Sequence, residues 1–201
     1  MTIGFMMDDI YFSADGLQHL PSHAALIGEI ITSFSLIEGV VGGIYGMLRH
    51  QEIDQALDDL NKLSSNHARV QAVRKLIGDH AELSKDAGND ALMKRVLDYA
   101  ELRNKVAHGV WGALRTDDKV AYRLPLKRWI STVAVIISAG TSGTFMDKID
   151  ALKAEMESYD LSALVNLKSE GEKLLADVFF LFNKVAKENA KADFWQEKLG
   201  D

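Results

Sequence analysis

Apolar residues recur at helical spacing along most of the chain. The first such segment runs from about 22 to 49, with Ser22 as its expected N-cap. Its apolar positions fall within roughly one third of a helical wheel, a stripe wide enough to face a core: Leu26, Ile30, Phe34, Ile37, Val41, Ile44 and Leu48. The segment is therefore predicted to be a long amphipathic helix.

The opposite arc of this helix gathers small residues: Ala24, Ala25, Gly28, Thr32, Ser35, Gly39, Gly42, Gly43 and Gly46. Each interior glycine costs about 1 kcal/mol relative to alanine. A stripe of this kind indicates that another backbone packs closely against it, in the same chain or in a second copy. A weak, bent helix is the alternative interpretation.

Three further helices are expected before residue 110. They cover about 51–60, 64–78 and the stretch from Asn89 or Asp90 to His108. Gly109 follows the last of them, and glycine is the residue type that best accepts a left-handed conformation just after a helix. Gly109 is therefore predicted to end this helix.

After Gly109 the spacing of the apolar residues changes from helical to alternating. Residues 110–114 and 120–124 flank the polar segment 115–119, a pattern that predicts a β-hairpin with a five-residue loop. The apolar run 129–139 fits either a third strand or a buried helix. Residues 140–143 indicate a linker, and helical spacing returns at 146–158 and 161–192.

These patterns predict a mainly all-α fold organised as a single domain over 1–201. The helical core spans about 22–109, the hairpin and the apolar segment about 110–139, and the C-terminal helices about 145–192. No segment repeats with a period of 20–50 residues, which excludes solenoids and propellers.

Composition narrows the class of protein. The 201 residues include no cysteine, which excludes a disulfide framework, a thiolate zinc site and a cysteine nucleophile. Residues 24–48 have the length of a membrane span, but they contain Glu29 and Glu38. With no signal-peptide pattern in the first residues, we expect a cytoplasmic protein that is not bound to a membrane.

The net charge of −6 disfavours general adhesion to nucleic acids. That average conceals a basic segment, 94–128, with nine basic and four acidic residues. Its basic residues are Lys94, Arg95, Arg103, Lys105, Arg115, Lys119, Arg123, Lys127 and Arg128. The segment permits a local phosphate site within an otherwise acidic chain.

The side chains that could transfer protons or bind a ligand lie at the end of the fourth predicted helix. Arg103 falls on the apolar face, where an unpaired guanidinium would cost several kcal/mol, so it must meet a carboxylate, a group of carbonyls or a ligand phosphate. Asn104 and His108 are four residues apart and therefore neighbours on the helix surface. A histidine, an arginine and an amide at one helix end can transfer protons and bind an anion. A structural ion pair for Arg103 and a simple helix cap for His108 are the alternatives.

The sequence from Arg103 to His108 resembles the R-N-x-x-x-H form of the motif of the HEPN superfamily. Residues 102–112 are similar to HEPN-like bacterial proteins in which a hairpin follows the motif, and 34–38 to their aromatic-x-x-x-Glu segment. The resemblance implies a HEPN-like helical bundle with a β-hairpin inserted after the motif helix. The resemblance covers residues 24–125, approximately.

What the resemblance implies about function is a metal-independent endoribonuclease, a toxin or defence effector acting on RNA at a homodimer interface. Arg103 and His108 take the motif positions and Asn104 is the polar residue after the arginine. A cognate antitoxin protein is a possible partner. The alternative is a non-catalytic dimeric module that binds a nucleotide, RNA or a protein, since the superfamily includes such members.

Our own reading of the residues adds Glu38 as the carboxylate best placed to pair with Arg103, or else an exposed helix glutamate. Some family toxins carry a tyrosine two residues after the histidine, where this chain has Val110, which puts regulation by modification of that tyrosine in doubt. No phosphate-binding glycine loop occurs, and His19 and His23 lack an obvious third metal ligand. We therefore expect neither a cofactor nor a metal.

Overall fold

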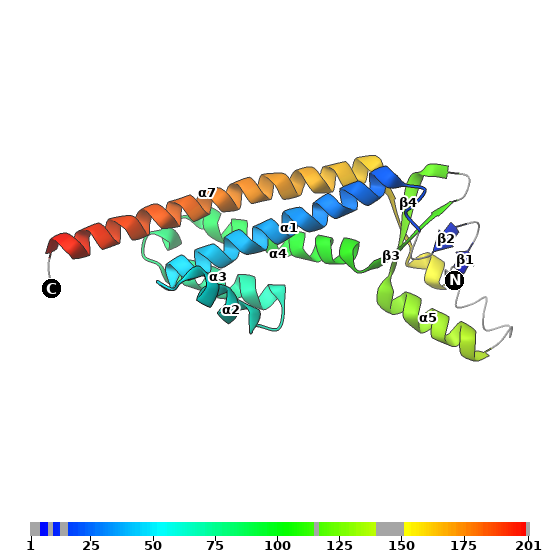
Figure 1. Cartoon of the computed structure of the whole chain (residues 1–201), viewed down its shortest axis with the longest axis horizontal. Helices are drawn as coiled ribbons and strands as arrows, with labels where there is room; N and C mark the ends of the chain where they lie inside the picture. The colour runs from blue at the N-terminus through cyan, green and yellow to red at the C-terminus, as the bar shows by residue number, and fades with distance from the viewer. Residues whose placement is uncertain (1–4, 8–9, 13–15, 115–116, 140–150, 200–201) are drawn as a thin grey trace. The chain divides into compact units, whose positions relative to one another are not determined.

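The structure, a computed structural model, describes residues 5–7, 10–12, 16–114, 117–139 and 151–199 (Figure 1). The chain divides into two compact units, each built from two separate stretches. The sheet unit comprises Met1–Ile31 and Arg103–Lys168, and the helical unit comprises Thr32–Leu102 and Ser169–Asp201.

The chain is mainly helical, as the apolar spacing predicts. Its helices are α1 (Pro21–Leu48), α2 (Ile53–Asn61), α3 (Asn66–Asp79), a 3-10 turn (Leu83–Lys85), α4 (Ala87–Ala107), α5 (Leu126–Ala139) and α7 (Leu161–Leu199). The run 129–139, which fits a strand or a helix from sequence, belongs to α5. Each of α1, α4 and α7 begins in one unit and ends in the other.

Two predicted helix starts were wrong. The first helix begins at Pro21, not after Ser22, because proline's fixed φ suits the first helical position. The fourth begins at Ala87, not after Asn89 or Asp90: the Asp86 carboxylate accepts the backbone N–H of Gly88 at 2.9 Å, and the buried Asn89 side chain donates to the Leu83 carbonyl at 2.8 Å. Asp86 therefore takes the capping role.

A small antiparallel sheet forms the centre of the sheet unit, with strand order β1-β2-β3-β4-β5. The strands are β1 (Phe5–Met7), β2 (Ile10–Phe12), β3 (Gly109–Leu114), β4 (Asp117–Pro125) and β5 (Glu157–Asp160). The predicted hairpin is β3 and β4, paired from Gly109↔Pro125 to Ala113↔Ala121. The loop is shorter than predicted, because β4 starts at Asp117, which pairs with Leu114 across a register shift.

The sequence analysis missed the other strands. β1 and β2 were not predicted, and the predicted helix over 146–158 was wrong at its end, where β5 begins at Glu157. Strands of three or four residues carry too few alternations for a period to be recognised. The predicted linker 140–143 and residues 146–150 lie outside the described residues.

The core of the sheet unit lies between the sheet and α5. Ile10, Phe12, Leu124 and Leu152 are buried, and Trp129 of α5 stacks against Phe12 with ring centroids 5.9 Å apart. A side chain at Gly112 would begin 2.7 Å from the Phe12 ring and 2.9 Å from the Tyr11 carbonyl oxygen. The absence of a side chain there lets β2 and β3 approach each other.

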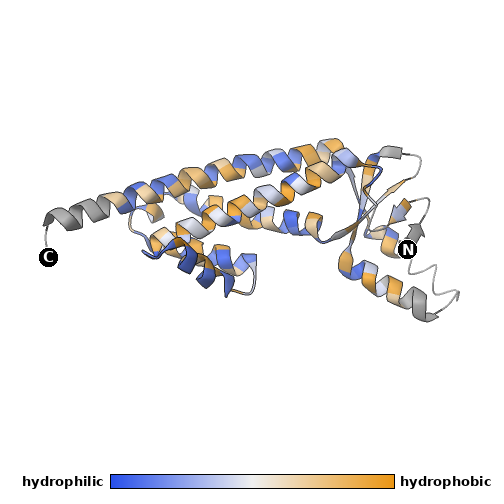
Figure 2. Cartoon of the chain, in the orientation of Figure 1, coloured by the Kyte–Doolittle hydropathy of each residue, from blue (hydrophilic) through white to orange (hydrophobic). Residues whose placement is uncertain are grey.

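The helical unit buries the predicted apolar stripe of α1 through Phe34, Ile37, Val41 and Ile44. Figure 2 shows this hydrophobic content along α1. Partners from α3, α4 and α7 are also buried: Val70, Val73, Ile77, Met93, Val96, Tyr99, Leu174, Val178, Leu181 and Val185. The helical unit therefore has a core of its own.

Part of the small-residue stripe is used within the chain. A Cβ at Gly42 would collide with Leu57 of α2, one at Gly46 would lie 3.0 Å from Ala56 of α2, and one at Gly43 would lie 2.8 Å from Phe182 of α7. Gly28 and Gly39 face open space. Close approach of neighbouring helices in this chain accounts for three of the glycines, so these three give no support for a second copy.

Among the described residues, α1 has the length and composition of a membrane span, with a mean hydropathy of 1.7 over 18 residues. A core helix of a soluble protein has the same properties. The cytoplasmic location therefore stays a prediction.

Candidate functional site

Arg103 and Asn104 lie near the carboxyl end of α4, and His108 follows the last residue of this helix, Ala107. Arg103 Nη1 donates to Asn104 Oδ1 at 3.1 Å, and the backbone N–H of His108 donates to the Asn104 carbonyl at 3.0 Å. Arg103 and Asn104 are half-buried, whereas His108 is exposed. The expectation that Arg103 lies on the apolar face is thus met only in part.

Two side chains of the β3–β4 hairpin fix this end of α4. Trp111 Nε1 donates to the Val106 carbonyl at 3.2 Å, and Arg123 Nε donates to the Lys105 carbonyl. The last carbonyls of a helix have no donor within the helix, so they need outside partners. The hairpin supplies them, which holds the turn that carries Asn104 and His108 in a defined orientation.

Arg123 is itself held in place. Its side chain is 6% exposed, and its Nη1 donates to Glu157 Oε2 of β5 at 3.1 Å. Tyr159 donates its hydroxyl to the same carboxylate oxygen at 2.7 Å and meets the Trp111 ring edge-on at 5.4 Å. Burial, together with the Glu157 carboxylate, raises the pKa of Tyr159 to about 12, so this donor stays protonated into alkaline solution.

Gly109 has a different role from the predicted one. Its φ lies outside the left-handed region, and it is the first residue of β3. A Cβ at Gly109 would lie 2.6 Å from Arg123 Cγ and 2.7 Å from Arg123 Nε. Gly109 therefore makes room for the arginine. The left-handed residue after a helix is instead His50, with φ 52° beyond α1.

The basic segment is partly neutralised by acids from elsewhere in the chain. Arg95 pairs with Asp177 at 2.7 Å, Arg123 with Glu157 at 3.1 Å, and Arg128 with Glu155 at 3.0 Å. The sequence analysis missed these pairs because all three acids follow the segment by many residues. The positive potential available to a long polyanion is correspondingly lower.

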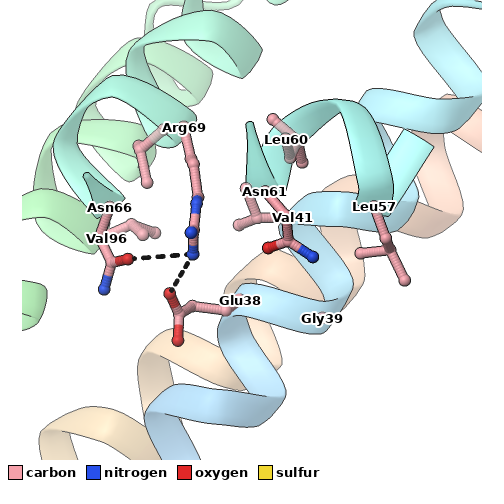
Figure 3. A pocket seen from close by; sticks show the side chains of 10 residues that line it. Glu38, Gly39, Val41, Leu57, Leu60, Asn61, Asn66, Arg69 and Val96 are labelled. Carbon is pink, nitrogen blue, oxygen red and sulfur yellow. Dashed lines mark hydrogen bonds and ion pairs between the residues drawn. The ribbon is translucent and has the colours of Figure 1, made fainter. Parts of the chain in front are cut away.

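Glu38 lies in the helical unit, with its Oε1 3.8 Å from Arg69 Nη1 of α3 (Figure 3). The Arg69 side chain is only 31% exposed. Arg103 belongs to the sheet unit, so the pairing of Glu38 with Arg103 stays a prediction.

His19 and His23 lie near the N-terminus. His23 is buried, with Nε2 3.2 Å from the Lys119 carbonyl oxygen. No group of three metal-ligating side chains occurs in the part of the chain that the structure describes.

Trp111 and Arg123 of the hairpin are buried and bind α4 and β5, so neither presents its side chain as a surface for stacking bases. The alternation of residues along β4 already indicates a buried Arg123, since Arg123 lies on the same face of the strand as the buried Ala121.

Comparison with known proteins gives no relative: no protein family, no curated protein and no solved structure matches the chain.

Proposed function

We propose that the protein is a HEPN-like, RNA-cleaving toxin or defence effector whose site combines Arg103, Asn104 and His108 of two protomers. The observation that supports it is an exposed histidine one turn from a half-buried arginine and asparagine, on a helix end held by Trp111 and Arg123. This arrangement offers a proton carrier beside a positioned cation.

The chemistry needs three groups. Attack of a ribose 2′-OH on the adjacent phosphate requires a base for that hydroxyl, an acid for the leaving 5′ oxygen, and a cation for the phosphate. One protomer supplies one motif histidine, and a two-fold contact supplies two, so one can act as base and the other as acid. Arg103, oriented by Asn104, is the cation. A cytoplasmic location and a neutralising antitoxin protein belong to this proposal.

A second candidate is a non-catalytic dimeric module that binds a nucleotide, RNA or a protein. The pairing of Arg95, Arg123 and Arg128 with carboxylates favours it. Basic residues that are already paired with carboxylates suit a contact with one or two phosphates better than a long RNA track.

Incubation of the purified protein with RNA in EDTA, followed by analysis of the product ends, separates the two candidates. An endoribonuclease of this type releases 2′,3′-cyclic phosphate ends, and His108→Ala abolishes the release. His67→Ala is the matched control, since His67 is an exposed histidine on α3. Equal cleavage by wild type and His108→Ala contradicts catalysis by the motif.

The binding module predicts a different outcome: no cleavage, and loss of nucleotide or RNA binding in Arg103→Ala while the fold is retained. A purely structural Arg103 predicts a large fall in the melting temperature of Arg103→Ala and no effect of His108→Ala. Light scattering at micromolar concentration tests the dimer that both candidates need. A monomer under those conditions contradicts both.

A further inference from the structure

A cavity of about 190 Å³ lies within the helical unit, among α1, α2, α3 and α4 (Figure 3). Its apolar lining is Val41, Leu57, Leu60, Val70 and Val96, and its polar lining is Glu38, Asn61, Asn66 and Arg69. Pockets for drug-sized ligands measure about 300–1,000 Å³. This cavity therefore suits a compact molecule, about one ring in size.

The polar groups form one edge of the cavity. Arg69 Nη1 donates to Asn66 Oδ1 at 3.3 Å and lies 3.8 Å from Glu38 Oε1 (Figure 3). The second distance is that of an ion pair and is too long for a hydrogen bond, which is not formed at about 3.6 Å or beyond. A guanidinium that donates and a carboxylate that accepts are thus neighbours without a direct hydrogen bond between them.

Arg69 also has unused donor capacity. Its Nε–H is buried with no hydrogen-bond acceptor among the described residues. Leaving a buried donor without an acceptor costs about 1–3 kcal/mol. An acceptor oxygen brought to the guanidinium by a ligand, with a small shift of the side chain, would offset this cost.

Charge restricts the ligand further. The cavity lining holds one carboxylate, Glu38, and one guanidinium, Arg69, so a charged ligand would be attracted by one of them and repelled by the other. The complement of an adjacent donor and acceptor is a neutral edge that carries an acceptor beside a donor. A ring lactam has this edge, with a C=O next to an N–H.

We propose that this cavity binds a small neutral heterocycle with a lactam edge, of the size of a pyrimidinedione ring. The ring C=O accepts from Arg69 and the ring N–H donates to Glu38, while the aliphatic side chains contact the ring faces. The proposal goes beyond the proposed function, because it depends on none of Arg103, Asn104 and His108.

Gly39 provides a way to block the cavity without disturbing the fold. It lines the cavity, and a Cβ built there meets no atom within 4 Å. Gly39→Val therefore places two methyl groups in open space at the cavity. Gly28→Val is the matched control, since Gly28 lies on the same helix, is equally open and does not line the cavity.

The experiment is a titration of the isotopically labelled full-length protein with uracil, followed by amide NMR shifts. We expect saturable shifts at the Gly39 backbone amide and at the side-chain amides of Asn61 and Asn66. 1,3-Dimethyluracil keeps both carbonyls but has no N–H, so it should bind at least about tenfold more weakly. Glu38→Gln should weaken uracil binding about tenfold, since the hydrogen bond loses its ionised acceptor.

Gly39→Val should abolish the shifts and Gly28→Val should leave them unchanged. Three results overturn the proposal: no saturable shift with uracil, equal binding of uracil and 1,3-dimethyluracil, or tighter binding of benzoate, which would make the cavity an anion site. Retained uracil binding in folded Gly39→Val overturns the assignment to this cavity. Since RNA cleavage is assayed separately, failure here does not bear on the proposed function.

Discussion

Arg123 is the residue on which the geometry of the candidate site depends most. Its guanidinium is almost fully buried and joins the carboxyl end of α4 to β5 through the Lys105 carbonyl and Glu157. Nothing in the motif itself fixes where His108 points, because His108 is exposed and follows the last residue of α4. Arg123 of the hairpin therefore positions the helix end that carries His108.

Substitution of Arg123 by alanine removes both contacts and leaves the Lys105 carbonyl without its donor. We expect the free energy of unfolding to fall by about 2 kcal/mol, measured by urea denaturation. Arg128→Ala is the control: its ion pair with Glu155 is exposed, so it should change stability by less than about 0.5 kcal/mol. Similar small losses in both variants would contradict the capping role.

Two tyrosines should titrate late in alkaline solution. Burial is the main cause that raises the pKa of Tyr99 and of Tyr159 to about 12, from an ordinary value of 10.0. A pKa raised by folding contributes stability below pH 10 that is lost as the pH rises through 12. Tyrosinate absorbance should therefore show two late groups, and Tyr99→Phe and Tyr159→Phe should each remove one. Titration of all tyrosines near pH 10 in the folded protein would contradict this.

At the scale of elements, the long helices could be predicted from the sequence and the short strands could not. Apolar residues repeat many times along α1 and α7, whereas β1, β2 and β5 have three or four residues each. The helices begin at Pro21 and Ala87, two to four residues before the predicted starts, because Ser22, Asn89 and Asp90 are good caps by residue type as well. The local sequence alone cannot decide which of several neighbouring polar residues caps the helix.

The glycines of α1 should respond in opposite directions to alanine. Gly28 is open, so Gly28→Ala should raise the free energy of unfolding by about 1 kcal/mol through helix propensity. At Gly43 the new methyl group would lie 2.8 Å from the Phe182 ring, and overpacking costs about 1–3 kcal/mol. Gly43→Ala should therefore lower stability by about 1 kcal/mol. Stabilisation of both variants in thermal unfolding would show that α7 does not pack closely there.

At the scale of the whole molecule, only part of the candidate site was accessible to sequence reasoning. Arg103 and Asn104 belong to α4 and His108 directly follows its last residue, so their placement at one helix end could be predicted from helical spacing. The contact of Glu38 with Arg69 and the cavity beside it depend on four helices meeting, and nothing in a single sequence gives that arrangement. The same holds for the carboxylates that neutralise the basic segment.

If the site needs the histidines of both protomers, mixing wild-type and His108→Ala protein should lower RNA cleavage in a characteristic way. When wild-type and His108→Ala protomers exchange freely, RNA cleavage should fall with the square of the wild-type fraction, because only dimers with two intact histidines are active. Cleavage measured over a series of mixing ratios distinguishes this from a linear fall. A linear fall would mean that each protomer cleaves by itself.

The division of the chain into two interleaved units also governs the order in which it can fold during synthesis. β2 pairs with β1 nearby in sequence, but its other edge pairs with β3, where Ile10 meets Leu114, and β3 is made about 100 residues later. The helical unit needs residues 169–201 as well as 32–102. Neither unit can be completed from a contiguous nascent segment, so this edge of β2 stays open until β3 has been made. An open strand edge can pair with other chains, so the nascent protein is most exposed to association before β3 is made.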